Sequence, residues 1–438
     1  MNIDSKVVTL FNEYFARIKE NIVTCGKTSM SVKLSDSSFA FVMNAGGGKI
    51  SENKVQTVII EQAQENRDIE RHRIIYCAIK DANAVIHTHT PYAAAIGKTG
   101  KTIPALLDDT AQIIGIDTRC CADDTANISK ILKKRKGCII IGNGTITHGR
   151  TLDEAYTGCL VLEKAAKCFI NANLLGNYKK IPYIEAVLMH FIYQKKYSKA
   201  NQNMLKNKQV TDNTIEIEQG VIDSGEAALR RQVVDAGKRL LNSNLVQGTW
   251  GNISIRLDDT HMLITPSGLD YLTIKPEDIV KVNFNTMEYE GKLKPSGEKD
   301  IHAMLLKSRK DINVVMHCHP NEGSAFAVAL LSMPVVSAEM QSCVKGDAKV
   351  SKYALPSTKS LAHATVKAIE GRNACFMANH GMLSVGVSID EAFECCQVME
   401  DSADKYIDAK AAEYDPSGNT AEEKRIDAFY KMVSLKMK

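Results

Sequence analysis

The fold of this chain of 438 residues is decided by two similar stretches, Asp81-Ala-Asn-Ala-Val-Ile-His-Thr-His89 and Asp311-Ile-Asn-Val-Val-Met-His-Cys-His319. The two stretches have identical residues at five positions and lie 230 residues apart. Further along, residues 152–156 resemble residues 389–393 at a separation of 237. Because two separate segments repeat at nearly the same distance, the sequence predicts a tandem duplication of one domain.

The duplication divides the chain into a first copy at 1–200, a linker at 201–222 and a second copy at 223–438. Residues 195–226 are rich in Lys, Asn, Gln, Asp and Ser, a composition typical of a loosely packed connection. Each copy has the size of one ordinary domain.

Helices and strands interleave in the second copy. Apolar residues at helical or strand spacing predict helices at 227–246, 299–307, 323–331 and 389–410. Strands are predicted at 252–256, 262–265, 279–283, 314–319 and 374–378. Because the elements do not follow a strict β-α-β period, we expect an α/β fold in which each copy has a mainly antiparallel central sheet flanked by helices.

Charge and composition exclude several classes of protein. The formal charge of +4 is too small to indicate a nucleic-acid partner. No stretch approaches the roughly 18 apolar residues of a membrane span, so no membrane association is expected. The N-terminus lacks the basic and apolar regions of a secretory signal, and 12 cysteines without a C-x-x-C pair suggest a reducing compartment. We therefore expect a cytoplasmic protein.

Histidines in the second copy have the spacing of a metal site. His317 and His319 are two apart on a predicted strand, and alternate residues of a strand point to the same face. His380 follows the apolar segment 374–378 and precedes a glycine. Three histidines leave a zinc ion with an open position, which is the catalytic arrangement. The alternative is three unrelated, half-buried histidines.

Small hydroxyl residues and glycines near Glu298 predict an anion site. Glu298 ends the segment Lys294-Pro-Ser-Gly-Glu298 at a predicted helix start, where the helix dipole alone also favours a carboxylate. Similar loops are Gly248-Thr-Trp-Gly-Asn252 and Thr265-Pro-Ser-Gly268. Such loops leave backbone N–H groups accessible to an anion, although each alone is also an ordinary turn. The three loops together predict a phosphate cradle.

These motifs, with His317-Cys-His319-Pro320 and Ala378-Asn-His-Gly381, occur in the order found in the class II aldolase/adducin family, which the chain therefore resembles. The resemblance covers essentially all of the second copy, and the first copy through the repeat. It implies a divalent ion, expected to be Zn²⁺, held by His317, His319 and His380. It also implies Glu298 as the catalytic carboxylate.

The same resemblance implies a set of residues that contact the substrate phosphate: Thr249, Asn252, Ser267, Gly268, Ser296 and Gly297. Aldolases of the family carry a second serine where this chain has Gly297, so one hydroxyl group is lost. A backbone N–H group at this position can still serve the anion.

The resemblance implies a metal-dependent lyase, with aldol cleavage of a phosphorylated ketose through a zinc-stabilised enediolate and proton transfer by Glu298. A sugar-phosphate 4-epimerase or a dehydratase would use the same site, and one sequence does not separate these activities. A non-catalytic, adducin-like interaction module is the alternative of another class. Such a module has no need to keep the three histidines and Glu298 together.

The first copy is expected to be degenerate. It keeps His87 and His89 as a vestigial metal site, but Asn143 stands where the second copy has His380. Two histidines and an amide oxygen bind zinc less well than three histidines. The repeat places Asp68 at the position of Glu298.

The sequence allows two interpretations of the role of the first copy. Lys27 and nearby glycines replace the anion loops of the second copy, and they offer a site for an anion. The other interpretation is a structural copy that preserves an interface between subunits.

The resemblance also predicts assembly. Family members form tetramers with four-fold symmetry, and a chain with two fused copies fills two of the four places. We therefore expect a homo-oligomer, a dimer that forms a pseudo-tetramer with alternating copies. The expected small-molecule partner is a sugar phosphate.

Overall fold

The computed structural model of the protein describes residues 4–44, 48–207, 224–291, 293–414 and 417–436. The chain divides into two compact units, one of Met1–Ile170 with Lys180–Lys195 and one of Asn171–Lys179 with Lys196–Lys438. The predicted linker at 201–222 begins inside helix α7 (Tyr183–Asn207), and its residues 208–222 lie outside the described residues. The domain boundaries at 200 and 223 stay a prediction.

The first unit contains a seven-stranded sheet with the order β3-β2-β1-β4-β9-β8-β7. Neighbouring strands are antiparallel, except that β7 and β8 are parallel. The strands are β1 (Thr28–Ser35), β2 (Ser38–Asn44), β3 (Gln56–Ile59), β4 (Ala84–Thr88), β7 (Cys120–Cys121), β8 (Gly137–Ile140) and β9 (Thr145–Gly149). A separate ribbon pairs β5 (Ile103–Pro104) with β6 (Asp117–Thr118).

Helices cover both faces of this sheet, because alternate strand residues on either face are apolar. Phe11, Met30 and Tyr156 belong to the core under α1 and α6, and Phe39 and Ile75 belong to the core under α2 and α5. The helices are α1 (Ser5–Asn21), α2 (Arg67–Ala78), α3 (Pro91–Thr99), α4 (Asp108–Ile113), α5 (Thr125–Leu132) and α6 (Leu152–Leu174), with the 3-10 turn η1 (Glu52–Lys54).

The second unit contains an eight-stranded sheet with the order β13-β12-β11-β10-β14-β17-β16-β15. Its strands are antiparallel except for the parallel pair β15 and β16. The strands are β10 (Asn252–Arg256), β11 (His261–Ile264), β12 (Val280–Asn283), β13 (Tyr289–Glu290), β14 (Val314–Cys318), β15 (Lys349–Val350), β16 (Ala374–Met377) and β17 (Gly381–Gly386).

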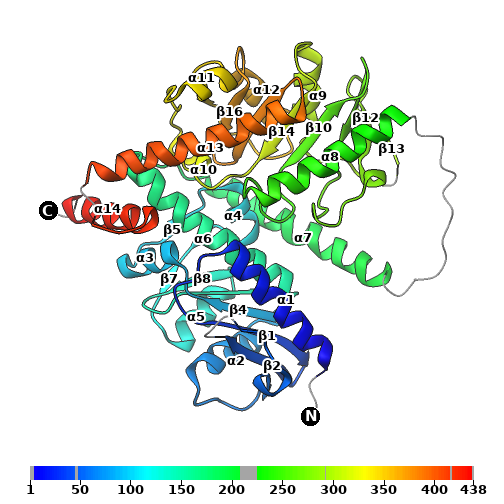
Figure 1. Ribbon diagram of the computed structural model, residues 1–438. Coiled ribbons are helices and arrows are strands. Elements are labelled where there is room, and N and C mark those ends of the chain that lie inside the picture. Colours follow the sequence, from blue (N-terminus) through cyan, green and yellow to red (C-terminus); the bar gives the residue numbers. More distant parts are fainter. Residues whose placement is uncertain (1–3, 45–47, 208–223, 292, 415–416, 437–438) are drawn as a thin grey trace. The chain divides into compact units, whose positions relative to one another are not determined.

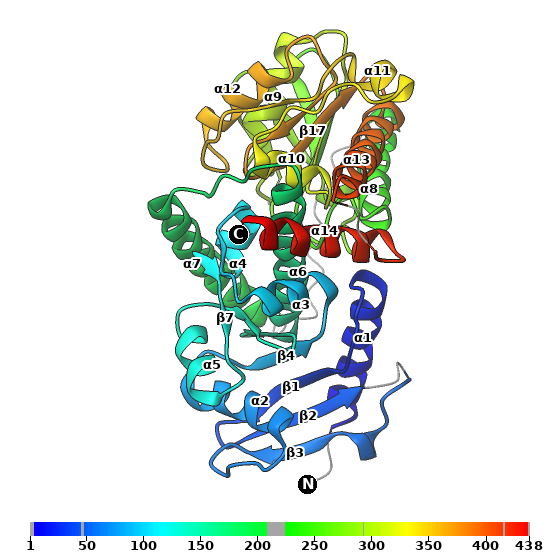
Figure 2. The ribbon, with the colours of Figure 1, turned by 90° about the vertical axis from the view of Figure 1, so that its left-hand side faces the viewer.

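Figure 2 shows this second sheet between α9 and α12 on one side and α8 and α13 on the other. Ile301, Leu305 and Leu361 of α9 and α12 pack on Val315 and Leu383 of the central strands. The helices are α8 (Ser224–Asn242), α9 (Lys299–Ser308), α10 (Gly323–Ala329), α11 (Ala338–Val344), α12 (Lys359–Ala368), α13 (Ile389–Ala412) and α14 (Ala421–Lys436), with the 3-10 turn η2 (Pro276–Asp278).

The two sheets confirm the predicted fold class, a mainly antiparallel sheet flanked by helices in each copy (Figure 1). The predicted strand at 252–256 is β10 at the same residues, and the predicted helix at 389–410 is α13, which continues to Ala412. The predicted helix at 323–331 is shorter and ends at Ala329, because Leu330 adopts a left-handed conformation with φ of 52°.

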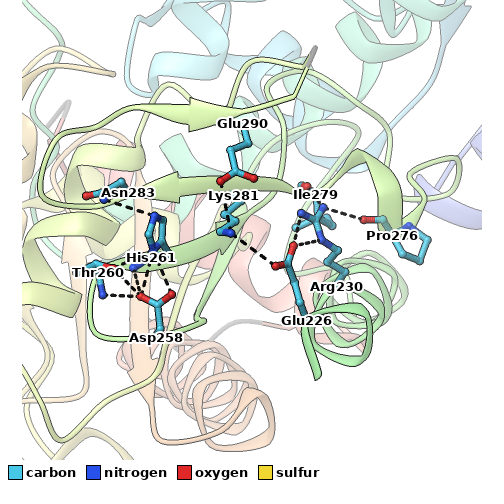
Figure 3. A network of polar contacts seen from close by, with 10 residues as sticks. All are labelled: Glu226, Arg230, Asp258, Thr260, His261, Pro276, Ile279, Lys281, Asn283 and Glu290. Atoms are coloured by element: carbon cyan, nitrogen blue, oxygen red, sulfur yellow. Dashed lines mark hydrogen bonds and ion pairs between the residues drawn. The ribbon is translucent and has the colours of Figure 1, made fainter. Parts of the chain in front are cut away.

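Polar contacts tie α8 to the outer strands of the second sheet (Figure 3). Arg230 of α8 donates to the backbone carbonyl of Ile279, just before β12, and its guanidinium pairs with Glu226 at 2.6 Å. Lys281 of β12 lies 3.4 Å from Glu290 of β13. These contacts hold the first turns of α8 against the segment that enters β12, and they join β12 to β13.

None of the described helices is long and apolar enough to cross a membrane. The 12 cysteines are all free thiols. The cytoplasmic location stays a prediction.

Candidate metal centre

Three buried histidines converge beside the central strands of the second sheet. His317 lies in β14, His319 follows that strand, and His380 lies in the turn between β16 and β17. The Nε2 atom of His317 is 2.9 Å from Nε2 of His319 and 3.0 Å from Nε2 of His380. Among the described residues, this is the one group of three or more His, Cys, Asp or Glu side chains whose ligand atoms all lie within 4.8 Å of one another.

The backbone determines which nitrogen of His317 faces this centre. Its Nδ1 atom donates to the carbonyl oxygen of Met382 at 2.8 Å, so the lone pair on Nε2 is directed at the other two rings. Nitrogens that bind one zinc ion at about 2.0–2.1 Å in tetrahedral geometry lie about 3.3–3.4 Å apart, close to the observed spacings. The three imidazoles therefore fit a transition-metal ion such as zinc, with a coordination position left open.

Gly251 allows the loop before β10 to approach the strand that carries the histidines. Its φ is +84°, and a β-carbon there would lie 2.7 Å from the backbone oxygen of His317. A side chain would meet both the steric cost of this conformation and that contact. The next residue, Asn252, then pairs with His317 across β10 and β14.

Glu298 completes the centre from the start of α9. Its Oε1 atom is 2.9 Å from Nε2 of His380, and its Oε2 atom is 3.3 Å from Nε2 of His317. Burial by itself raises the pKa of Glu298, but the charges of His317 and His380 and two hydrogen bonds lower it by more. The pKa of Glu298 therefore lies well below the usual carboxyl range, and the side chain is a carboxylate facing the histidines.

Asn252 and His302 hold this carboxylate in place. The amide Nδ2 of Asn252 donates to Oε2 of Glu298 at 2.9 Å, so the Asn252 oxygen faces His302. Nε2 of His302 donates to that oxygen at 2.5 Å, while Nδ1 accepts from the hydroxyl of Ser254 at 2.7 Å. Burial lowers the pKa of His302 to about 3 and keeps the ring neutral, as this pattern requires.

Sequence reasoning missed His302, although a signal for it was present. His72 precedes His302 by the same 230 residues that separate the two H-x-H motifs. The rings also have equivalent partners, because His72 contacts the hydroxyls of Ser29 and Ser31 at 3.0 and 2.7 Å. The repeat therefore indicates that both copies place a buried histidine at this position beside the first strand of the site.

Two of the predicted phosphate loops lie side by side. Ser267 donates its backbone N–H to Lys294 at 2.9 Å, and Ser296 donates its own to Thr265 at 3.0 Å. These bonds bring together Ser267, Gly268, Ser296 and Gly297 next to Glu298. The side chain of Asn252 donates a hydrogen bond directly to Glu298.

Thr249, the remaining predicted phosphate ligand, lies on the exposed loop before β10. No hydrogen bond within the described part of the chain joins Thr249 to the other two loops. The following residue, Trp250, has its ring centroid 6.5 Å from that of His319.

The first unit keeps His87 and His89 but uses their nitrogens differently. Nε2 of His87 donates to the backbone oxygen of Asn143 at 2.7 Å, and Nε2 of His89 lies 3.0 Å from the side-chain oxygen of Asn143. Burial lowers the pKa of His87 to about 4, so this ring is neutral near pH 7. The vestigial metal site stays a prediction, and the atoms that would face an ion are engaged by Asn143.

A family model described as Class II Aldolase and Adducin N-terminal domain matches the chain twice, over residues 15–170 and 231–407. The 5-deoxy-D-ribulose 1-phosphate aldolase of Bacillus thuringiensis serovar kurstaki is 34% identical over 183 residues, which are 42% of this chain and 85% of that protein. The 5-methylthioribulose-1-phosphate/5-deoxyribulose-1-phosphate aldolase of Rhodospirillum rubrum is 34% identical over 181 residues, which are 41% of this chain and 80% of that protein.

A solved structure of an L-fuculose 1-phosphate aldolase is similar to 47% of this chain over 96% of its own length, with 32% identity and a TM-score of 0.41. Each of the two curated relatives therefore matches about one copy of the duplicated chain. The two matches of the family model agree with the tandem repeat read from the sequence.

Proposed function

The chain belongs to the class II aldolase and adducin family and is an aldolase-type lyase, and we propose that its second unit cleaves a phosphorylated ketose at a divalent metal centre. The observation that carries the proposal is the convergence of three buried imidazole Nε2 atoms beside the Glu298 carboxylate.

We assign the metal ligands to His317, His319 and His380, and zinc is the ion that three imidazoles favour. When bound, such an ion supplies Lewis-acid stabilisation of the negative charge that develops on substrate oxygens. The three histidines leave a position open, as a catalytic rather than a structural site requires.

Glu298 is the proposed acid/base group. Its two oxygens lie beside His317 and His380, so the carboxylate is placed to exchange a proton with a substrate bound at the metal. Asn252 and His302 orient the carboxylate, so that its position does not depend on the substrate.

The substrate phosphate is proposed to bind the loops beside Glu298. Their residues offer hydroxyl and backbone N–H groups, which suit an anion held as a positioning anchor. The proposed contacts are Thr249, Asn252, Ser267, Gly268, Ser296 and Gly297. Because the relatives act on 1-phosphates of ketoses, a ketose 1-phosphate is the proposed substrate class.

The chain is further proposed to form a homo-oligomer. Apolar side chains of α7 support this idea, because Tyr183, Ile184, Phe191 and Ile192 are 68%, 80%, 55% and 53% exposed, and exposed apolar patches mark interaction sites. Sedimentation at micromolar concentration tests the state. A dimer has twice the 48.2 kDa of one chain, and a species of single-chain mass contradicts the proposal.

The function is tested by two substitutions read out for both metal and turnover. His380→Ala is expected to lose the bound ion and activity together. Glu298→Gln is expected to keep the ion and lose activity by roughly 100-fold or more, the size of a lost acid/base contribution. His363→Ala, at an exposed histidine of α12, is the matched control and changes neither.

Metal content is measured by mass spectrometry on protein purified without chelator, and a panel of ketose 1- and 5-phosphates is followed by NMR. Wild-type protein that binds no divalent ion after addition would contradict the metal centre. Full turnover in Glu298→Gln would remove Glu298 from the reaction.

A further inference from the structure

The first unit has a cavity of about 440 Å³ at the position that corresponds to the metal centre of the second unit. This volume falls within the range of about 300–1,000 Å³ that is usual for small-molecule sites. The cavity is lined by Lys27, Ser29, Met43, Arg67, Asp68, Arg71, His87, His89 and Asn143. It therefore contains three cationic side chains.

Sheet register aligns one of these cations with an uncharged residue of the second unit. Ser29 pairs with His87 as Asn252 pairs with His317, so Lys27 corresponds to Trp250.

The repeat of 230 residues aligns the other two. It places Arg67 at the position of Gly297 and Arg71 at that of Ile301. The equivalent contacts of His72 and His302 support this alignment. All three cations thus stand where the second unit has no charge.

Arg71 is largely neutralised inside the first unit. Its guanidinium donates to Asp123 at 2.8 and 2.6 Å and to Asp68 at 2.5 Å, and the residue is only 6% exposed. Arg71 therefore orders the wall of the cavity, and its carboxylate partners hold it rigidly.

Lys27 and Arg67 carry the available positive charge. Both are exposed at the cavity, and neither forms an ion pair with a described residue within 4.0 Å. Arg67 projects from the first position of α2, where the helix dipole also favours an anion. The charge at this cavity is therefore suited to an anionic ligand.

The interior of the cavity is polar but is not arranged for a metal ion. Asn143 engages Nε2 of both His87 and His89, and its amide nitrogen donates to Asp123 at 3.0 Å. Nδ1 of His89 donates to the backbone oxygen of Lys27 at 2.8 Å. These bonds also fix the loop that presents Lys27.

We propose that this first-unit cavity binds a small organic phosphate monoester without a metal ion, with Lys27 and Arg67 contacting the phosphate. The cavity is larger than a phosphate ion, so the organic part of the ligand occupies the space in front of His89 and Asn143. The site is separate from the proposed aldolase centre and uses cations in place of the metal.

Calorimetric titration of the full chain, treated with EDTA, with ribose 5-phosphate tests this proposal. Wild-type protein is expected to show a binding event that Lys27→Gln/Arg67→Gln weakens at least tenfold. Lys130→Gln/Lys133→Gln removes two exposed charges elsewhere in the first unit and is expected to leave the affinity unchanged. Both double variants alter exposed side chains, and circular dichroism verifies that they fold.

Trp250 distinguishes the two units, because it is the single tryptophan and lies near His319. Binding in the first unit is expected to leave its fluorescence unchanged. The proposal is overturned if no heat is observed, if the Lys27/Arg67 variant binds as tightly as wild type, or if all binding changes Trp250 fluorescence.

A parallel titration with inorganic phosphate identifies the ligand class. Tighter binding of ribose 5-phosphate supports a site for the whole ester, and equal affinities overturn it in favour of free phosphate. Neither titration measures cleavage or metal content, so failure of the proposed aldolase activity would not alter these results.

Discussion

The hydroxyl oxygen of Ser357 lies 2.5 Å from the point that a β-carbon on Gly297 would occupy. Ser357 itself has φ of +61°, a left-handed conformation that is unfavourable for residues other than glycine. The loop before α12 therefore places a hydroxyl group in the space that a side chain at position 297 would occupy.

Gly297→Ser is accordingly expected to impair the site, although serine is the residue that the family resemblance implies at this position. The new side chain would collide with Ser357 and displace the loop that is proposed to bind the phosphate, raising KM for a ketose 1-phosphate by about tenfold, or roughly 1.4 kcal/mol. The double variant Gly297→Ser/Ser357→Gly removes the collision and is expected to recover most of the affinity. Steady-state kinetics measures both, and equal KM in the single variant and wild type would contradict the packing argument.

His302→Leu is expected to slow turnover while the metal is retained. Loss of the imidazole frees Asn252 and with it the orientation of Glu298, and such supporting contacts are worth about 10–100-fold. The measurement is kcat together with metal content.

His72→Leu is the matched control for this change, since it removes the equivalent buried histidine of the first unit. It is expected to cost similar stability but leave kcat unchanged. Equal loss of kcat in both variants would show a general effect of unfolding.

Asn143→His is expected to raise the bound metal from one ion per chain to two. The substitution supplies a third imidazole beside His87 and His89 and removes the side-chain oxygen that lies against His89, while the backbone oxygen that faces His87 remains. Asn143→Ala removes the side-chain acceptor without adding a ligand and is expected to stay at one ion. Metal analysis after dialysis decides, and one ion per chain in Asn143→His would contradict the correspondence of the two sites.

Acid is expected to destabilise the first unit through His148. Burial lowers the pKa of this histidine to about 3, and its Nε2 donates to the backbone carbonyl oxygen of Arg135 at 3.0 Å. The ring is neutral in the folded protein but takes up a proton in the unfolded chain below about pH 6.5. The free energy of unfolding should therefore be constant above this pH and fall by about 1.4 kcal/mol per pH unit between pH 6 and 4 for this one group.

Urea unfolding at several pH values measures this dependence. His148→Gln keeps a hydrogen-bond donor but does not titrate. Its free energy of unfolding is therefore expected to fall less steeply with decreasing pH than that of wild type, by the contribution of one histidine. Identical slopes would exclude His148 as a source of the acid sensitivity.

Lys164→Met is expected to destabilise the first unit by about 3–5 kcal/mol, because it removes a charge partner from a buried carboxylate. Lys164 Nζ lies 3.0 Å from Oδ2 of Asp109, and their side chains are 1% and 0% exposed. Lys164→Met/Asp109→Leu removes both charges and is expected to regain much of that stability. Denaturant midpoints measure both, and a double variant no more stable than the single one would contradict this explanation.

Local patterns were enough to predict much of the fold and part of the site. Apolar spacing located β10 at its residues and α13 within two residues of its end, because burial on one face produces that spacing. The two-residue period of a strand placed His317 and His319 on one face. The Asn-His-Gly turn after an apolar strand identified His380.

Contacts between elements that are far apart along the chain could not be predicted from local patterns. The sequence alone determined that the chain is duplicated, which residues form the strands, and which histidines differ between copies, since each follows from residue type and spacing. Only the tertiary structure decided that Asn252 and His302 support Glu298, that Ser357 fills the space beside Gly297, and that Asp123 neutralises Arg71. These residues are 46 to 60 positions from their partners along the chain and lie in different elements. The register of the strands and the packing of the loops bring them together.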